Sequence, residues 1–268
     1  MSITAESIWQ DIRQIRQKAP LVHNITNYVV MNTTANALLA IGASPVMAHA
    51  MEEVEQMAAI AAALVINIGT LSEPWVKAMA AAMKIAGGKG IPVILDPVGV
   101  GATEYRTKTA EQLMAVVSPT IIRGNASEII ALVVSDAKTK GVDSTAASNS
   151  AVATGKTLCQ TSGSTVCISG ATDYIIGDDD VVTISNGHPL MLRVTGLGCT
   201  ASALCGAFAA VNPSGAQATA HAMATMGIAA ELAAENASGP ATFQTAFIDS
   251  LYHIRAGDIE RLLKSGTE

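Results

Sequence analysis

The sequence predicts an α/β fold in which a mainly parallel central sheet carries helices on both faces. Short β-rich runs alternate along the chain with longer helical stretches, which is the order expected of βαβ units. Apolar β-branched runs such as Val93-Ile94-Leu95 lack the polar alternation of a half-exposed strand. Such runs indicate central strands that are buried on both faces.

The composition agrees with this fold class. Half of the 268 residues are hydrophobic but only 3% are aromatic, so Ala, Val, Ile, Leu and Met supply the apolar surface. Small side chains let helices pack closely on a sheet, which fits an Ala-rich α/β enzyme better than an aromatic-rich β-sandwich. The chain shows no linker, repeat or low-complexity run, so we expect one domain over residues 1–268 that buries a substantial core.

Individual elements follow from apolar periodicity and turn residues. The expected strands are 44–48, 63–68, 92–96, 120–123, 165–169, 173–177, 181–184 and 190–194. The expected helices are 6–17, 29–41, 53–61, 73–87, 107–117, 126–133, 148–160, 199–211, 216–235, 240–251 and 258–263. In segment 173–194 the strands are joined by the turn runs 177–180 and 186–189 rather than by helices, which predicts a β-meander at the edge of the sheet.

Several classes of protein are disfavoured. The best apolar run, 57–68, is shorter than the roughly 18 residues that a membrane-spanning helix needs. No signal peptide is visible, so we expect a soluble, cytoplasmic protein with reduced cysteines. The four cysteines lack metal-type pairing. A net charge of −6 without a basic run argues against a nucleic-acid partner.

The strongest local sign of a binding site is the turn Thr195-Gly196-Leu197-Gly198-Cys199, expected between a strand and a helix of small residues. Its glycines allow a tight turn and a close backbone approach, and the helix start offers unpaired N–H groups and the positive end of the dipole. Thr195, Gly196 and Gly198 are therefore candidate phosphate-binding residues. Taken alone, the pattern fits an ordinary strand-to-helix turn equally well.

Other expected strands also end in polar residues. Asp96 closes one strand, Arg123 and then Glu128 follow the next, and Ser169 ends a third. Ligands of open α/β sheets bind beyond the carboxyl ends of the strands, so these ends together fit a nucleotide-dependent phosphotransferase. Asp96 and Glu128 are candidate Mg²⁺ ligands, and Arg123 is a candidate phosphate ligand. The alternatives are a capping Asp, a surface Arg and an exposed first-turn Glu.

Longer motifs follow one another over roughly residues 15–250. They include Asn67-Ile68-Gly69-Thr70-Leu71, Arg123-Gly124-Asn125-Ala126-Ser127-Glu128 and Asn186-Gly187-His188, together with residues 23–32, 35–47 and 96–102. In this order they resemble the motifs of the hydroxyethylthiazole kinase family, and the segment 24–47 is distinctive of that family.

The resemblance implies a ribokinase-like fold that binds ATP at the carboxyl ends of its strands. The implied reaction is the Mg²⁺-dependent phosphorylation of 4-methyl-5-(2-hydroxyethyl)thiazole by ATP, a step of thiamine salvage. It also implies a homotrimer whose active sites lie between subunits. By position, Met47 and Gly196 would contact the substrate, while Arg123 and Ser169 would bind ATP.

Cys199 distinguishes between branches of this superfamily. Related sugar and pyridoxal kinases have an Asp general base there, whereas the thiazole kinases are similar to this chain in having Cys. A helix N-terminus can lower the pKa of a thiol from about 8.5 into the physiological range, so that it accepts the substrate proton. A loose phosphoryl-transfer transition state needs little help from a base, however. We therefore expect Cys199 to assist and shape the site without being indispensable.

Asn27 is a candidate substrate-binding residue. It is one of several Asn residues just before or within the start of an expected helix, where Asn is a poor helix former. Helix capping accounts for one or two of these Asn residues. For Asn27, substrate recognition is the more specific interpretation.

Competing functions remain open at this point. A kinase of the same superfamily acting on hydroxymethylpyrimidine or pyridoxal would have another loop at 44–47 and usually Asp at 199. A nucleotide-dependent dehydratase on the same scaffold is a second possibility. A Rossmann oxidoreductase fails because the glycine turn comes late in the chain rather than after the first strand. A purely binding or regulatory protein would leave the polar strand ends unexplained.

Overall fold

The computed structural model describes residues 2–134, 144–177 and 180–267. Its strands are β1 (Leu21–Ile25), β2 (Ser44–Val46), β3 (Ala63–Asn67), β4 (Val93–Asp96), β5 (Ile121–Asn125), β6 (Thr165–Ser169), β7 (Asp173–Ile176), β8 (Val181–Ile184) and β9 (Ser265–Thr267). Its helices are α1 (Ala5–Lys18), α2 (Met31–Ile41), α3 (Val54–Ile60), α4 (Glu73–Lys89), α5 (Glu104–Val116), α6 (Ala126–Val133), α7 (Ser144–Ser162), α8 (Leu197–Ala209), α9 (Gly215–Ala234), α10 (Pro240–His253) and α11 (Ala256–Leu262), with a 3₁₀ helix η1 (Pro189–Arg193).

All of these strands join one sheet in the order β2-β1-β3-β4-β5-β6-β7-β8-β9. The pairs from β2 to β6 are parallel, and those from β6 to β9 are antiparallel. This confirms the predicted fold class, a mainly parallel sheet with an antiparallel edge. The prediction of a single domain over the whole chain stays a prediction.

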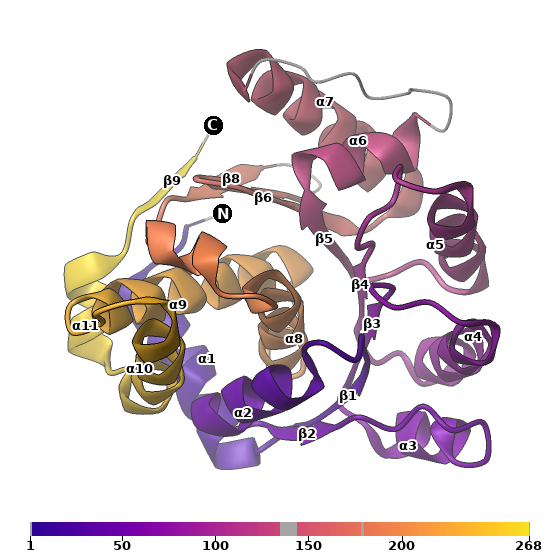
Figure 1. Cartoon of the computed structure of the whole chain (residues 1–268), viewed down its shortest axis with the longest axis horizontal. Coiled ribbons are helices and arrows are strands. Elements are labelled where there is room, and N and C mark those ends of the chain that lie inside the picture. The colour runs from indigo at the N-terminus through magenta and orange to yellow at the C-terminus, as the bar shows by residue number, and fades with distance from the viewer. Residues whose placement is uncertain (1, 135–143, 178–179, 268) are drawn as a thin grey trace.

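Helices cover both faces of the sheet (Figure 1). One core lies between the sheet and the layer of α1, α2, α8, α9, α10 and α11, and the other lies between the sheet and α3 to α7. Every residue of β3 and β4 is buried, as their uninterrupted apolar runs predict. No helix in the described ranges has the length and apolarity that crossing a membrane requires.

The predicted strand 190–194 is wrong, because this segment forms η1. Pro189 fixes a helical φ at its first position, and Nδ1 of His188 accepts a hydrogen bond from the N–H of Leu190, so the local bonds favour a helical turn over a strand. The meander is therefore limited to β7 and β8, and β9 forms the outer edge. The middle of the predicted turn 177–180, Asp178 and Asp179, lies outside the described residues.

The structure adds two strands that the pattern did not predict, β1 and β9. β1 contains two buried polar residues, which hide its strand character in the sequence. His23 bonds through Nε2 to the carbonyl of Ala48 at 2.7 Å, and Asn24 donates through Nδ2 to the carbonyl of Val22 at 2.9 Å. Strand β9 is short and exposed, and it pairs only with β8.

Candidate active site

The polar residues predicted at the strand ends lie where α8 crosses the carboxyl ends of the central strands. Helix α8 packs directly on β1, β3 and β4, and its small side chains permit this approach. At Gly206 an added Cβ would lie 2.7 Å from the Val65 side chain and 3.2 Å from that of Val22. The close packing fixes the N-terminus of α8 above the end of β4.

The glycine turn forms the N-terminus of α8 as an open cap. Gly196 is the N-cap residue with φ +85°, and no side chain caps the helix. The N–H of Thr200 is the first to bond back, to the carbonyl of Gly196 at 2.9 Å. The N–H groups of the first turn, from Leu197 to Cys199, are therefore the unpaired donors that bind anions at helix N-termini. The anion-binding role of this turn stays a prediction, and η1 rather than a strand precedes the turn.

Asp96, at the end of β4, is buried directly beneath α8. Its Oδ2 accepts hydrogen bonds from Nδ2 of Asn67 at 2.7 Å and from Oγ of Ser202 at 2.8 Å. Burial raises the pKa of Asp96 from an ordinary 3.8 to about 6, although Arg123 and these two hydrogen bonds oppose the rise. Because both bonds go to Oδ2, Oδ1 receives none from the described residues and can accept a ligand.

Cys199 lies in the first turn of α8, where Nδ2 of Asn27 approaches its Sγ to 3.3 Å. Burial and the neighbouring negative Asp96 raise the pKa of the Cys199 thiol, and these effects outweigh the amide hydrogen bonds and Arg123. The expectation that the helix N-terminus lowers this pKa into the physiological range is therefore wrong. The thiol is neutral, because burial and a nearby carboxylate both disfavour the thiolate.

Arg123, on β5, bridges the glycine turn and the end of β6. Its Nη1 donates to the carbonyl of Gly198 at 3.0 Å, and its Nη2 donates to Oγ of Ser169 at 2.7 Å. Burial lowers the pKa of Arg123, but the surrounding acidic groups, Asp96 first among them, outweigh it and keep the net shift upward. The Nε group is buried without a partner in the described residues. Arg123 is thus a charged group inside the fold rather than a surface Arg.

Glu128 belongs to the capping box that starts α6, and it is half-buried rather than exposed. Its Oε2 accepts from the N–H of Asn125 at 2.8 Å, and its Oε1 accepts from the N–H of Gly99 at 2.8 Å. Glu128 also raises the pKa of Asp96 through its negative charge, so it lies close enough to act on that carboxylate. The loop after β4 is therefore tied to the start of α6 through this side chain.

The donor set fits Mg²⁺ bound largely through water. Each oxygen of Glu128 receives only one hydrogen bond and Oδ1 of Asp96 receives none, so both carboxylates keep free lone pairs. In the described part of the chain no three His, Cys, Asp or Glu side chains are grouped as metal ligands. Mg²⁺ usually keeps several waters and takes one or two carboxylates together with substrate phosphates. Asp96 and Glu128, two carboxylates beside the open helix N-terminus, match this coordination preference of Mg²⁺.

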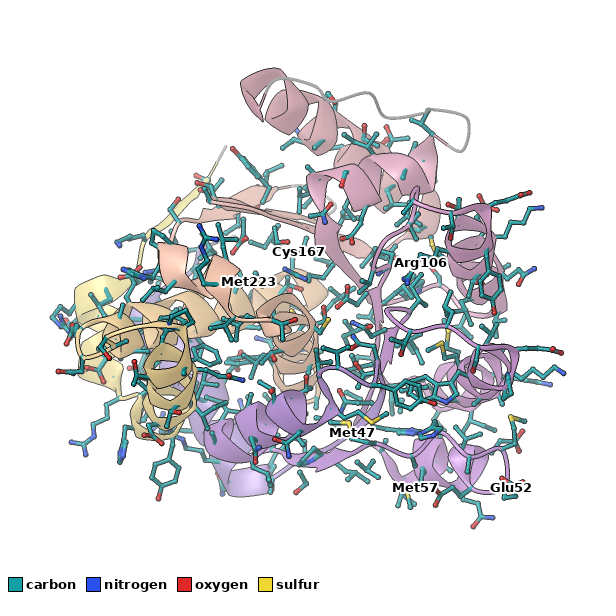
Figure 2. All side chains as sticks on the ribbon, in the orientation of Figure 1. Met47, Glu52, Met57, Arg106, Cys167 and Met223 are labelled. Atoms are coloured by element: carbon teal, nitrogen blue, oxygen red, sulfur yellow. The ribbon has the colours of Figure 1, made fainter. Side chains whose placement is uncertain are left out.

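A cavity of about 560 Å³ opens beside the glycine turn, and Cys199 is not among the residues that line it. Its lining includes the polar residues Arg123 and Ser169 together with Gly198 of the turn. Apolar residues also line it, among them Met223 of α9, labelled in Figure 2, and Leu192 of η1, which is 89% exposed. The cavity therefore combines apolar side chains with the polar residues beside the glycine turn.

Met47 and Thr195 lie outside the hydrogen-bonded network. Met47 follows β2 directly and lies between α2 and α3 in the view of Figure 2. Nearby at the same sheet edge, the Trp75 ring lies 4.6 Å from that of Tyr28 and 4.4 Å from that of His49. Thr195 is exposed just before the turn.

Three residues that sequence reasoning did not single out complete the site. Asn67 and Ser202 hold Oδ2 of Asp96, and Asp173 lines the cavity. Asn67 is the polar last residue of the apolar strand β3, just as Asp96 is the polar last residue of β4. The same pattern that pointed to Asp96 could therefore have pointed to Asn67. Ser202 lies within an apolar helix one turn after Cys199, and nothing in the sequence marks it.

Comparison with known proteins gives a consistent picture. The family model described as the hydroxyethylthiazole kinase family matches residues 12–257. A hydroxyethylthiazole kinase of Syntrophus aciditrophicus is 64% identical over 265 residues, covering 98% of each chain. The structure of a hydroxyethylthiazole kinase from Pyrococcus horikoshii superposes with a TM-score of 0.91 at 42% identity, over 98% of this chain and 99% of that one. A ribokinase-like superfamily protein from Enterococcus faecalis shares the fold, with a TM-score of 0.59 at 15% identity over 94% and 90%.

Proposed function

The chain belongs to the hydroxyethylthiazole kinase family, and we propose that it transfers the γ-phosphoryl group of ATP to the hydroxyl of 4-methyl-5-(2-hydroxyethyl)thiazole. The reaction breaks the bond between the γ-phosphorus and the bridging oxygen of ATP and forms one to the alcohol oxygen. The products are ADP, the thiazole phosphate and the proton of the hydroxyl. Such a step serves thiamine salvage, and we expect it to take place in the cytoplasm.

The observation that carries this proposal is the open N-terminus of α8 between Arg123 and Cys199. The unpaired N–H groups from Leu197 to Cys199 suit the phosphoryl group in transfer, with Gly196 and Gly198 keeping side chains out of its way. Arg123 is a fixed positive charge at the same turn. Phosphoryl transfer depends mostly on positioning and on neutralising charge, and this arrangement supplies both.

Cys199 is proposed to orient the substrate hydroxyl rather than to remove its proton in advance. A neutral thiol is a poor proton acceptor, and the raised pKa of Cys199 keeps it neutral. In a loose transition state the alcohol can attack before it loses its proton, so the thiol needs only to hold the hydroxyl in line. Asn27 would fix the thiol from the other side through its Nδ2.

Mg²⁺ is proposed to bind between Asp96, Glu128 and the phosphates, where it would neutralise the negative charge of the β- and γ-phosphates. Asp96 would bind the metal through its free Oδ1. Asn67 and Ser202 would keep Oδ1 oriented toward the metal, because both donate hydrogen bonds to Oδ2. Glu128 is held in the same way by two backbone N–H groups.

The nucleotide is proposed to occupy the cavity beside the turn. Its polar residues Arg123 and Ser169 would bind the phosphates, and its apolar residues, among them Met223 and Leu192, would contact the adenine. The volume of about 560 Å³ suits a ligand of this size. The thiazole is then proposed to bind on the Cys199 side of the turn, where Met47 and Gly196 would contact it.

A homotrimer with active sites between subunits is proposed as the working form. Tyr28 and Val29 directly follow Asn27 and are each 64% exposed. Exposed apolar side chains beside a site are favourable when a neighbouring subunit covers them.

The proposed reaction is tested by an ADP-release assay with three alcohols side by side: the hydroxyethylthiazole, hydroxymethylpyrimidine and pyridoxal. We expect a clear preference for the thiazole and a phosphate monoester in the ³¹P NMR spectrum of the product. Preference for either other alcohol would overturn the substrate assignment. ADP release without any phosphate ester would point to a different nucleotide-dependent reaction, such as dehydration.

A further inference from the structure

Arg106 has no direct part in the proposed reaction, and we infer that it is a positioning residue for both proposed metal-binding carboxylates. It lies in the first turn of α5, half-buried beside the loops that follow β3 and β4 (Figure 2). Its Nη1 donates to the carbonyls of Ile68 at 2.8 Å and Val98 at 2.6 Å, and its Nη2 donates to the carbonyl of Gly69 at 2.8 Å. One guanidinium thus joins both loops.

The first contact acts on Asn67 through a single peptide group. The carbonyl of Ile68 and the N–H of Gly69 belong to the same planar trans peptide, so they point in opposite directions. Arg106 binds the carbonyl end, and Oδ1 of Asn67 accepts from the N–H end at 2.9 Å. The peptide is therefore held between the two side chains. Asn67 in turn donates to Oδ2 of Asp96, so Arg106 fixes the group that orients this carboxylate.

The second contact acts on Glu128 in the same manner. The carbonyl of Val98 and the N–H of Gly99 form one trans peptide. Arg106 binds its carbonyl end, and Oε1 of Glu128 accepts from its N–H end at 2.8 Å. A positive charge on the carbonyl polarises the peptide and makes its N–H a stronger donor. Arg106 therefore strengthens the bond that orients Glu128.

Only an arginine suits this position. A guanidinium is a rigid fork of donors, and its two terminal nitrogens together reach three carbonyls. Lysine has a shorter side chain with one nitrogen at its end, so it cannot replace both Nη1 and Nη2. The stem of Arg106 also packs against Gly99, where an added Cβ would lie 3.2 Å from its Cδ. Within the described ranges Arg106 forms no ion pair, so its charge acts on peptide carbonyls alone.

The inference rests on the proposed roles of Asp96 and Glu128, and its consequence is specific. Without Arg106 both loops can shift, whereas Cys199 and Met47 lie on other segments of the chain. Small misplacements of reacting groups can cost about 100-fold in rate, and loss of an outer partner of a metal ligand costs roughly 10- to 100-fold in metal affinity. Turnover and metal binding should therefore fall together, and kcat should change more than the KM for the thiazole alcohol.

The experiment compares Arg106→Lys and Arg106→Ala with Lys108→Ala on the same helix, where Lys108 forms an exposed pair with Glu104. Mn²⁺ binding is measured by electron paramagnetic resonance with a non-hydrolysable ATP analogue and no alcohol present. We expect both Arg106 variants to lose about 100-fold in kcat and roughly tenfold or more in Mn²⁺ affinity. Added guanidinium ions should restore part of the kcat of Arg106→Ala, and Lys108→Ala should match wild type.

A lower melting temperature with unchanged kcat and Mn²⁺ affinity in Arg106→Lys would make the residue merely structural and overturn the inference. The same holds if guanidinium fails to raise the kcat of a folded Arg106→Ala variant. If Arg106→Ala does not fold, the kcat and the Mn²⁺ affinity of Arg106→Lys alone test the inference. The comparison is made with whichever alcohol the wild-type enzyme phosphorylates, so a wrong substrate assignment would not be mistaken for a wrong role of Arg106.

Discussion

The side-chain nitrogen of Asn27 lies 3.3 Å from the sulfur of Cys199. The same nitrogen donates to Oδ1 of Asn67 at 2.9 Å, and Asn67 donates to Oδ2 of Asp96 at 2.7 Å. A short chain of amide groups thus connects the proposed alcohol-binding thiol to the proposed metal-binding carboxylate. The two halves of the site are held by common partners, and each can be tested separately.

Asn27→Asp should impair catalysis strongly, because it replaces the donor of this chain by an acceptor. One oxygen of the carboxylate would face Oδ1 of Asn67, which keeps its bond from the N–H of Gly69. The carboxylate oxygen would be a buried acceptor without a donor, which costs about 1–3 kcal/mol. We expect kcat/KM for the thiazole to fall about 10- to 100-fold, as measured by steady-state kinetics. Asn36→Asp, at an exposed position on α2, is the matched control. An Asn27→Asp enzyme as active as this control would contradict the role of Asn27.

Cys199→Ala and Cys199→Asp measure how much the thiol contributes. Because burial and Asp96 keep the thiol neutral, its loss removes an orienting contact rather than a base, and we expect more than about a thousandth of kcat to remain in Cys199→Ala. Cys199→Asp should keep or raise the rate, because it supplies a proton acceptor. Cys159→Ala, a buried cysteine on α7, is the control for cysteine removal. Loss of activity below a thousandth in both Cys199 variants would show that the thiol is indispensable.

Most of the fold was predictable because its signals are local. Apolar runs such as Val93-Ile94-Leu95 cannot remain exposed, so β3 and β4 were evident from the sequence. Strand β1 was missed because His23 and Asn24 make it look polar, and the partner that satisfies His23, the carbonyl of Ala48, is known only from the tertiary structure. The segment 190–194 was misread because its mostly apolar composition was given more weight than the helical start set by Pro189.

The candidate site was predictable in its residues but not in its electrostatics. The polar strand ends predicted that Asp96, Arg123, Glu128 and Ser169 lie together, and the contacts of Arg123 with Ser169 and Gly198 support this. The pKa of Cys199 was misjudged because the helix dipole is visible in the sequence, whereas burial and the closeness of Asp96 are not. Arg106 was not singled out because its partners are backbone carbonyls, which any sequence could provide.

Gly198→Ala separates the geometry of the anion site from the stability of α8. Alanine is the better helix former by about 1 kcal/mol, so the variant should be at least as stable as wild type to urea. Its Cβ, however, would lie 3.1 Å from Nη1 of Arg123 and displace the guanidinium. We expect kcat/KM for ATP to fall by about tenfold, the effect of losing one charge-assisted hydrogen bond of roughly 1.5 kcal/mol.

Gly196→Ala is the contrasting variant, because it should lose stability as well as activity. Gly196 has φ +85°, and its added Cβ would lie 2.5 Å from Cγ1 of Val30. That variant should lose stability by about 1–3 kcal/mol. A Gly198→Ala enzyme with wild-type kinetics would mean that Arg123 does not need its observed position.

Tyr28→Ser tests the proposed trimer. If a neighbouring subunit covers the 64% exposed Tyr28, the variant should dissociate at a higher protein concentration than the wild type on dilution, and lose activity as it does so. Light scattering coupled to size-exclusion chromatography gives the mass, and activity is followed over the same dilution series. Tyr252→Ser is a matched control, because Tyr252 is 65% exposed on α10. A wild-type enzyme that is a fully active monomer would reject the trimer outright.

Asp173→Asn should change how stability depends on pH. Burial raises the pKa of Asp173 from an ordinary 3.8 to about 6, despite the opposing effects of the Gly170 N–H and Arg123. Because this folded-state pKa lies above the unfolded value, its contribution to stability is fully present below pH 3.8 and is lost as the pH rises through about 6. Above that pH the wild-type protein must bury an ionised carboxylate, which costs roughly 3 kcal/mol at most.

Asparagine keeps an acceptor for the N–H of Gly170, which bonds Oδ1 of Asp173 at 3.0 Å, but it has no charge to bury. The free energy of unfolding of Asp173→Asn, measured in urea relative to wild type, should therefore increase between pH 4 and pH 8 by up to roughly 3 kcal/mol. The buried Asp96 is present in both proteins, so its own contribution cancels in the difference. Asp249→Asn is the control, because the exposed carboxyl of Asp249 keeps its water in the folded protein. A difference that stays constant with pH would mean that Asp173 is hydrated or fully paired, and that the wall of the proposed nucleotide cavity is more open than the burial of Asp173 indicates.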